Sequence, residues 1–245
     1  MKQMNIAATP LASKLTQFIE LSADELGCLD RLQTNTRSFD RRANLRSEGE
    51  SDAQCFVLQH GWACCYKLLR NGRRQIINFA IPGDFLGLRS VLFRVSDHSI
   101  ASVTPVQVSS FSEHELFETI NRYPRVAIAI LWALSCEEAI VVEHLVNLGR
   151  RNALERVAHF LIEFGERLQV VGLATDKGYE CPFSQEDLAD ALGLSAIHIN
   201  RILRQLRERQ LLTLSRGKLQ IYDLPKLAKI AQFSDQYLDQ DHRTS

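Results

Sequence analysis

The chain of 245 residues lacks the features that mark a membrane protein or a secreted protein. Its longest uninterrupted apolar run, Val126 to Leu134, falls well short of the roughly 18 residues that a membrane-spanning helix needs. The first fifteen residues, MKQMNIAATPLASKL, contain no apolar core of the kind found in signal peptides. We therefore expect a cytoplasmic protein that has no membrane partner.

The sequence also lacks the short patterns of common catalytic and metal sites. Its 7 histidines are scattered, and no P-loop, G-x-S-x-G or G-x-G-x-x-G pattern occurs. The 6 cysteines form no C-x-x-C pair, so we expect reduced and mostly buried thiols, with a redox or metal role as the alternative. We expect no enzyme activity, no catalytic residue, no metal site and no cofactor.

Neither sign of charge is in excess, because 29 basic residues balance 29 acidic ones. Overall charge therefore gives no reason to expect binding to nucleic acid, and any such affinity must come from a local concentration of charge. A hydrophobic content of 45% and a charged content of 24% are those of an ordinary globular protein. The length suggests one large domain or two modest ones.

Short alternating runs between residues 37 and 111 predict a β-sandwich or β-barrel. The runs GWACCYKLL and RRQIINFA flank Asn71 and Gly72, a pair that favours a type I′ hairpin turn. The stretch SIASVTPVQVSSF predicts two more strands that meet near Pro105. A helical segment from residue 11 to about residue 32, in which Ser22 and Glu25 form a capping-box pattern, is expected to precede this β-domain.

A long helix is predicted from Pro124 to about Gly149. Its apolar residues recur at spacings of three and four, which is the pattern of a coiled-coil seam, with Glu138 as one acidic interruption. The helix either lies buried against its own domain or forms a dimer. We favour the dimer, because the helix follows a complete β-domain and its first part is apolar on all sides. The predicted homodimer interface comprises Leu131, Leu134, Val141, Leu145 and Leu148.

Residues 185–212 predict a helix-turn-helix. Ser184 and Asp187 form a capping pattern for the first helix, and Asn152 with Glu155 caps an earlier one in the same way. A glycine corner and a second capping serine follow the first helix. The residues at the packing and corner positions of a DNA-binding helix-turn-helix are Leu188, Ala189, Leu192, Gly193, Leu194, Ile199 and Ile202.

The outward face of the second helix is predicted to contact DNA, because Ile199 and Ile202 face inward. Arg201 can bind a guanine with two hydrogen bonds, and Asn200 can reach an adenine or a phosphate. Ile197 either contacts a thymine methyl group or is a half-buried packing residue. The predicted DNA-binding residues here, some of them better placed for phosphates, are Ser184, Ser195, Ala196, Ile197, His198, Asn200, Arg201 and Arg204.

Basic residues concentrate around this helix although the whole chain is neutral. Residues 195–218 contain six basic side chains and one acidic one, Glu208, which gives a local net charge of +5. The stretch LLTLSRGKLQIYD predicts a hairpin whose tip carries Arg216 and Lys218. A basic wing of this kind is suited to phosphate contacts, so double-stranded DNA is the expected partner.

In this order of elements the chain resembles the CRP/FNR family of bacterial transcription regulators, from about Phe39 to Asp223. The resemblance rests on NGRRQIINFAIPGDFLG, GRRNALERVAHFL and FSQEDLADALGLSAIHINRILRQLRERQLL. It implies an α+β fold with an N-terminal cyclic-nucleotide-binding-like β-roll (jelly-roll-like), a long dimerisation helix and a C-terminal winged helix-turn-helix. We expect the β-roll sensor domain at 1–122, the dimerisation helix and hinge at 123–149, and the DNA-binding domain at 150–245.

The resemblance also implies a homodimer that binds a palindromic promoter site and recruits RNA polymerase. The chain departs from the family at the effector site. Members that bind cyclic AMP carry a Gly-Glu pair and then an Arg-Ser/Thr-Ala stretch. Gly83 and Asp84 correspond to the pair. The stretch VSDHSIAS corresponds to the second part of the motif and contains no arginine. The adenine-binding Thr-Ser pair falls on Val141 and Val142. These four residues form the expected effector pocket, and control by cyclic AMP is not expected.

Two further departures follow from the same comparison. An FNR-type iron–sulfur centre needs an N-terminal cysteine cluster, and only Cys28 lies there. In the recognition helix, Ala196 and Ile197 replace the Arg-Glu or Val-Glu pair of the best-known members, so the preferred DNA site should differ. The effector remains unspecified. The alternative function is a ligand-binding or cupin-like β-barrel whose helix-turn-helix serves protein interaction, although a metal cupin needs clustered His and acidic ligands.

Overall fold

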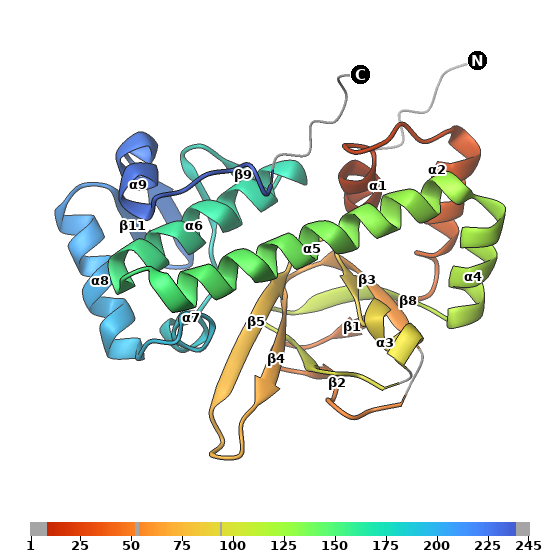
Figure 1. The fold of residues 1–245 in the computed structure, drawn as a ribbon, viewed down its shortest axis with the longest axis horizontal. Helices are drawn as coiled ribbons and strands as arrows, with labels where there is room; N and C mark the ends of the chain where they lie inside the picture. Colours follow the sequence, from red (N-terminus) through yellow and green to blue (C-terminus); the bar gives the residue numbers. More distant parts are fainter. Residues whose placement is uncertain (1–8, 52–53, 94, 239–245) are drawn as a thin grey trace.

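A long helix, α5 (Pro124–Arg150), crosses the molecule and joins a β-roll to a smaller C-terminal domain (Figure 1). The structure is a computed structural model that describes residues 9–51, 54–93 and 95–238. Pro124 occupies the first turn of α5, as predicted, where its missing N–H costs no hydrogen bond. No helix in these described ranges combines the length and the apolar character that a membrane crossing requires.

The predicted N-terminal helical segment consists of two short helices with a break between them. The helices near the N-terminal half of α5 are α1 (Pro10–Leu15), α2 (Ala23–Arg31) and α4 (Glu113–Arg122). Ser22 and Glu25 form the predicted capping box, which starts α2 and thereby interrupts the segment. Apolar residues of α1, α2 and α4 share one core cluster with the buried face of α5.

The β-roll consists of two four-stranded sheets that pack face to face around an apolar core. One sheet has the order β1-β8-β3-β6 and the other β2-β7-β4-β5. The strands are β1 (Thr36–Phe39), β2 (Asn44–Arg46), β3 (Cys55–His60), β4 (Ala63–Leu68), β5 (Arg74–Ala80), β6 (Phe85–Leu86), β7 (Ser99–Ser102) and β8 (Val106–Phe111), with helix α3 (Leu88–Phe93) between β6 and β7. This arrangement confirms the predicted β-domain.

The β4–β5 hairpin forms as predicted, but its turn is of a different type. A type I′ turn needs a positive φ at both central residues, and only Gly72 has one here, at 79°. The backbone N–H of Gly72 donates to the carbonyl of Leu69 at 2.9 Å, so the turn begins two residues before Asn71. The prediction of a type I′ turn is therefore wrong, because the strands separate at Leu68 and leave a longer loop.

The C-terminal domain is a set of helices around a small four-stranded sheet of order β11-β12-β10-β9. Its elements are α6 (Ala153–Val170), β9 (Ala174–Thr175), β10 (Gly178–Glu180), α7 (Gln185–Leu192), α8 (Ala196–Glu208), β11 (Leu212–Ser215), β12 (Lys218–Ile221) and α9 (Leu224–Ala231). The capping box of Asn152 and Glu155 starts α6, as predicted. Sequence reasoning found the β11–β12 hairpin but missed β9, β10 and α9.

The two faces of α5 differ in burial. Val126, Ala129 and Ala133 are buried against the β-roll, so this face packs within its own chain. The opposite face leaves six large apolar side chains substantially exposed, between 41% and 70% each. We call this surface the α5 stripe; its members are Ile128, Leu131, Val141, Val142, Leu145 and Val146. Of the predicted interface residues, Leu134 and Leu148 are only partly exposed, because each also contacts its own chain.

Candidate nucleic-acid interface and neighbouring cavity

The turn between α7 and α8 is held by local hydrogen bonds. Ser184 Oγ accepts from the backbone N–H of Asp187, and Asp187 Oδ2 accepts from the backbone N–H of Ser184, both at 3.0 Å. Helix α7 ends at Gly193, whose φ of 63° lies in the left-handed region that favours glycine. Ser195 Oγ then accepts from the backbone N–H of His198 at 3.2 Å and caps α8. These contacts confirm the predicted helix-turn-helix.

The inner face of α8 is buried, and this decides which of its side chains point outward. Ile199 and Leu206 are fully buried and Ile202 is nearly so. They belong to the same apolar cluster as Leu188 and Leu192 of α7. Because successive residues of an α-helix are turned by about 100° around its axis, the opposite side of α8, which includes Ile197, Asn200, Arg201 and Arg204, faces away from the domain.

Ile197 stands out on this outward face because it is 85% exposed. A large apolar side chain left in water adds no burial free energy to the fold of the single chain, so the packing role is excluded. The thymine-methyl role stays a prediction. The other predicted contact residues on the helix-turn-helix are either exposed (Ser195, Asn200, Arg201 and Arg204) or half-buried (Ser184, Ala196 and His198).

Two of the basic side chains on α8 have polar partners within the chain. Arg201 Nη2 lies 2.9 Å from His198 Nε2. Because a guanidinium group only donates hydrogen bonds, Nε2 of His198 is the acceptor in this contact. Arg204 Nε donates to Glu208 Oε1 at 2.8 Å. Contact between Arg204 and a DNA phosphate therefore competes with this ion pair.

The wing is the tight turn between β11 and β12. Arg216 and Gly217 both have positive φ, 50° and 74°, as a two-residue hairpin requires. The backbone N–H of Cys181 donates to the Gly217 carbonyl at 2.7 Å and ties the wing to the segment that follows β10. Arg216 and Lys218 are exposed, as predicted, and Lys218 forms an exposed ion pair with Glu180 at 3.0 Å.

A cavity of about 420 Å³ lies between the β-roll and α5, a volume typical of small-molecule sites. Its charged lining is mainly acidic: Glu137 and Glu138 come from α5, and Asp97 is already paired with Arg89 at 3.0 Å. Burial raises the pKa of the Glu137 carboxyl to about 7. The side chains around the cavity belong to Cys65, Ile77, Asn78, Phe85, Leu88, Arg89, Ser90, Ser96, Asp97, His98, Leu134, Glu137, Glu138 and Val141.

Of the four predicted effector-pocket residues, only Val141 lines this cavity. The Asp84 carboxylate forms an ion pair with Lys14 of α1 instead. Gly83 packs against the backbone at the start of α1, and Val142 is 55% exposed on the α5 stripe. The structure therefore places Gly83, Asp84 and Val142 outside this cavity, whose lining in this part of the chain begins at Phe85.

The acidic lining of the cavity was missed at the sequence level. Glu138 stood out as an acidic interruption of the apolar seam, and Glu137 directly precedes it. Two consecutive carboxylates on a long apolar helix are unfavourable to bury and therefore indicate a polar space beside the helix. This pattern was the available signal.

Comparison with known proteins agrees with this architecture. Residues 36–123 match the cyclic nucleotide-binding domain, and residues 155–230 match the Crp-like helix-turn-helix domain. The transcriptional activatory protein AadR of Rhodopseudomonas palustris is 32% identical over 203 residues, which cover 82% of this chain and 83% of that protein. The chain belongs to the CRP/FNR family.

Further members of the CRP/FNR family support the same assignment. The nitrogen fixation regulation protein FixK of Bradyrhizobium diazoefficiens is 32% identical over 193 residues, covering 79% of this chain and 80% of that protein. The solved structure of FixK2 from Bradyrhizobium japonicum has a TM-score of 0.73 and 27% identity, and the match covers 82% of this chain and 98% of that one. The chain is thus a DNA-binding transcription regulator, as predicted.

The cupin-like alternative has no support from the placement of side chains. Within the described ranges, no three His, Cys, Asp or Glu side chains lie close enough together to hold a metal ion. CRP/FNR proteins are transcription regulators rather than enzymes. No disulfide joins the cysteines, all of which are described, and burial raises the pKa of Cys64 to about 11 and that of Cys181 to about 12.

Proposed function

We propose that two copies of the chain pair along the α5 stripe and bind a palindromic promoter site as a homodimer. The exposure of the stripe is the observation that carries this proposal. Soluble monomers rarely leave a large contiguous apolar patch in water, and such patches mark interaction sites. A second copy presents the same surface, which suits the self-complementary interface of a two-fold dimer. Each copy then contributes one α8 to successive major grooves, about 34–36 Å apart.

In this proposal Arg201 reads a guanine and Ile197 contacts a thymine methyl group. Asn200 reaches an adenine or a phosphate, and Ala196 allows close approach of the helix. The residues assigned to backbone phosphates are Ser184, Ser195, His198, Arg204, Arg216 and Lys218. Residues 1–122 form the sensor domain, 123–149 the dimerisation helix and hinge, and 150–245 the DNA-binding domain. The family resemblance supports RNA polymerase as a further partner, in the cytoplasm.

A pair of salt titrations tests the DNA-binding roles. Fluorescence anisotropy would measure affinity for a selected operator and for a random duplex. Arg201→Ala should lower the affinity for the operator by about ten- to a hundredfold per contact, because a bidentate guanine contact is worth roughly 1–3 kcal/mol. The affinity for the random duplex should stay nearly unchanged. Lys218→Ala should weaken both duplexes alike and lower the salt slope by about one. If Arg201→Ala lowered the affinity for both duplexes equally, Arg201 would be a phosphate contact and not a base contact.

Lys67 provides the matched control for these variants. It is an exposed lysine on β4 that pairs with Glu48 at 2.6 Å, on the opposite side of the hinge from the wing. Lys67→Ala should leave both affinities and both salt slopes unchanged. A loss as large as that of Lys218→Ala would show that the assay reports overall charge rather than a defined contact.

Cyclic AMP is not required for operator binding in this proposal. The cavity presents the Glu138 carboxylate in its lining, and a carboxylate repels the phosphate of a cyclic nucleotide. Calorimetry should therefore detect no binding of cyclic AMP at micromolar concentration, and the nucleotide should not change operator affinity. Micromolar binding together with tighter operator binding would overturn this part of the proposal.

A further inference from the structure

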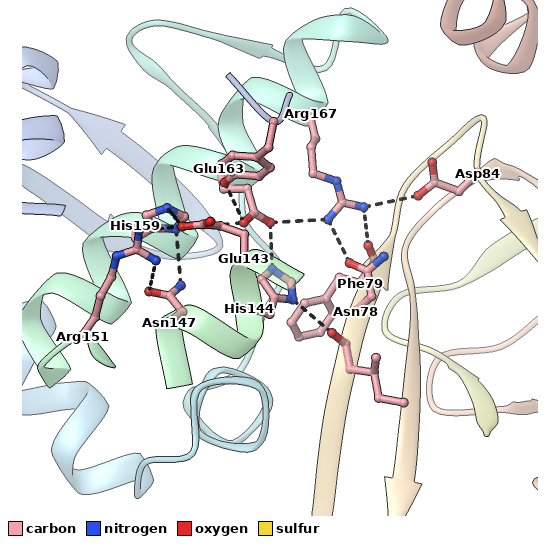
Figure 2. Close-up of polar contacts among 12 residues, drawn as sticks. Asn78, Phe79, Asp84, Glu143, His144, Asn147, Arg151, His159, Glu163 and Arg167 are labelled. Carbon is pink, nitrogen blue, oxygen red and sulfur yellow. Dashed lines mark hydrogen bonds and ion pairs between the residues drawn. The ribbon is translucent and has the colours of Figure 1, made fainter. Parts of the chain in front are cut away.

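Helix α6 carries a row of buried polar side chains at a spacing of four residues. His159 and Glu163 are completely buried, and Arg167 is 8% exposed. Figure 2 shows the polar contacts of these three side chains. Charges withdrawn from water destabilise a protein unless they are well paired. The partners of this row therefore decide how α6 sits against the rest of the chain.

Arg167 reaches out of the C-terminal domain into the β-roll. Its Nη1 donates to Asn78 Oδ1 at 3.0 Å, and its Nη2 donates to the carbonyl of Phe79 at 2.7 Å. The same Nη2 lies 3.4 Å from Asp84 Oδ2 (Figure 2). Asp84 is itself held by the backbone N–H of Ile81 at 3.0 Å. One guanidinium group thus contacts β5 and the segment that follows it in three directions.

A second polar link connects α6 to the β-roll through α5. His144 Nε2 lies 2.9 Å from Glu163 Oε1, and His144 Nδ1 lies 3.1 Å from the carbonyl of Ile77. Both ring nitrogens face acceptors, so both carry protons and the ring is an imidazolium. Glu163 Oε2 also accepts from the hydroxyl of Tyr237 at 3.0 Å. This buried ion pair fixes α6 nearer to the hinge than Arg167 does.

The other contacts between the two domains are either apolar or more exposed to solvent than Arg167. Phe79 packs on Phe183 with ring centroids 4.1 Å apart, but apolar contacts are non-directional. Arg74 on β5 pairs with Asp187 and Asp190 of α7 at 2.8 and 2.9 Å, and its side chain is 28% exposed, so solvent and salt weaken this pair. The planar guanidinium of Arg167 is both buried and directional.

We propose that Arg167 is a positioning residue for DNA binding, which fixes the angle between the helix-turn-helix domain and the β-roll through Asn78, Phe79 and Asp84. This inference rests on the proposed dimeric binding to a palindrome. Arg167 lies fifteen residues after the Asn152 cap, which is about 22 Å along α6 from the hinge. A contact this far from the hinge limits rotation of the C-terminal domain relative to the β-roll. In a dimer, that angle sets the distance between the two recognition helices.

Half-site spacing is the readout that separates positioning from simple stabilisation. Full-length protein would first select an operator from random-sequence duplexes, and one base pair would then be added or removed between the half-sites. The wild type should lose about tenfold or more in affinity for either altered spacing, because both helices can no longer bind at once. Arg167→Lys keeps the positive charge but loses the planar guanidinium group that bonds several acceptors at once. Its affinities for the original, the shortened and the lengthened operator should therefore agree within about threefold.

Asn78→Ala removes one of the three partners of Arg167 and should relax the spacing preference in the same direction. The double variant should not relax the preference further than Arg167→Lys alone, because the lysine no longer presents the Nη1 donor to which Asn78 responds. Asn78→Ala also decides the question if Arg167→Lys does not fold. Arg46→Lys is the matched control, because Arg46 is a buried arginine that donates hydrogen bonds to Ser90 and Gln54 within the β-roll. This substitution should destabilise the chain but keep the wild-type preference for one half-site spacing.

The outcomes distinguish this inference from the proposed function. If the wild type selects no palindrome, or binds one as a monomer, the proposed dimer fails. If the wild type shows the sharp spacing preference and folded Arg167→Lys and Asn78→Ala retain it, Arg167 only stabilises the fold and the positioning role is overturned. A relaxed preference in Arg46→Lys would overturn it as well, because any destabilised variant would then behave in this way.

Discussion

Truncating two leucines of the α5 stripe should convert the proposed dimer into monomers without unfolding the chain. Leu131 and Leu145 are the best sites, because they are 63% and 70% exposed and so contribute little to the fold of one copy. Leu134 is a poorer choice, since it packs against the core beneath α5. The double variant Leu131→Ala/Leu145→Ala removes apolar area from the proposed interface and introduces no charge.

The expected magnitude follows from the exposed fractions of these side chains. Complete burial of a leucine is worth about 1.5–3 kcal/mol, so covering roughly two thirds of one contributes about 1–2 kcal/mol. A dimer contains four such side chains, which together contribute about 4–8 kcal/mol. Because every 1.4 kcal/mol is a factor of ten, the dissociation constant of the dimer should rise about a thousandfold or more.

Sedimentation equilibrium over nanomolar to micromolar concentrations would measure this change, and circular dichroism would check the fold. Operator affinity should fall together with dimer mass, because a monomer binds only one half-site. Leu173→Ala is the control, since Leu173 is 45% exposed but lies beyond α6. A folded double variant that remains a dimer at nanomolar concentration would refute the assignment of the α5 stripe as the interface.

Two further predictions concern carboxylates. The folded pKa of Glu137 is about 7 against an ordinary 4.5, so the wild type should lose stability as pH rises from 4.5 to 7, when the unfolded chain releases this proton first. In urea unfolding, Glu137→Gln should have a larger free energy of unfolding than the wild type at pH 8 and the same value at pH 4. A gain in stability that did not depend on pH would show that ionisation of Glu137 is not its cause. Glu208→Gln should free Arg204 and tighten binding to random duplexes, because Arg204 no longer has to leave Glu208 to reach a phosphate, whereas an unchanged affinity would contradict this competition.

The parts of the fold that local interactions determine could be predicted from the sequence. Helix starts at Ser22, Asn152 and Ser184 depend on a residue and its neighbour three positions on, and all three capping boxes are present. The corner at Gly193 follows from the conformational freedom of a single residue. The helix-turn-helix is made almost wholly of such local signals, which is why it was the most readily recognised part of the chain.

Contacts between distant segments could not be predicted in the same way. The partners of Asp84 come from Lys14 and Arg167, 70 and 83 residues away, and no local pattern announces them. Arg167 has the charge of a solvated helix residue, yet it follows His159 and Glu163 at intervals of four on the buried side of α6. Charged residues that recur on the apolar side of a helix are the signal that indicates such a buried row.

Asn78 has two neighbours with different roles, since it lines the cavity and also accepts a hydrogen bond from Arg167. Any molecule that entered the cavity and competed for the Asn78 amide would bind with different free energies in the DNA-bound and DNA-free protein. Thermodynamic linkage requires the reverse effect to be equal, so an operator duplex would change the affinity for that molecule by the same factor. Saturating the protein with DNA is therefore a way to search for the occupant of the cavity: compounds whose binding changes when operator is added are those that engage this amide.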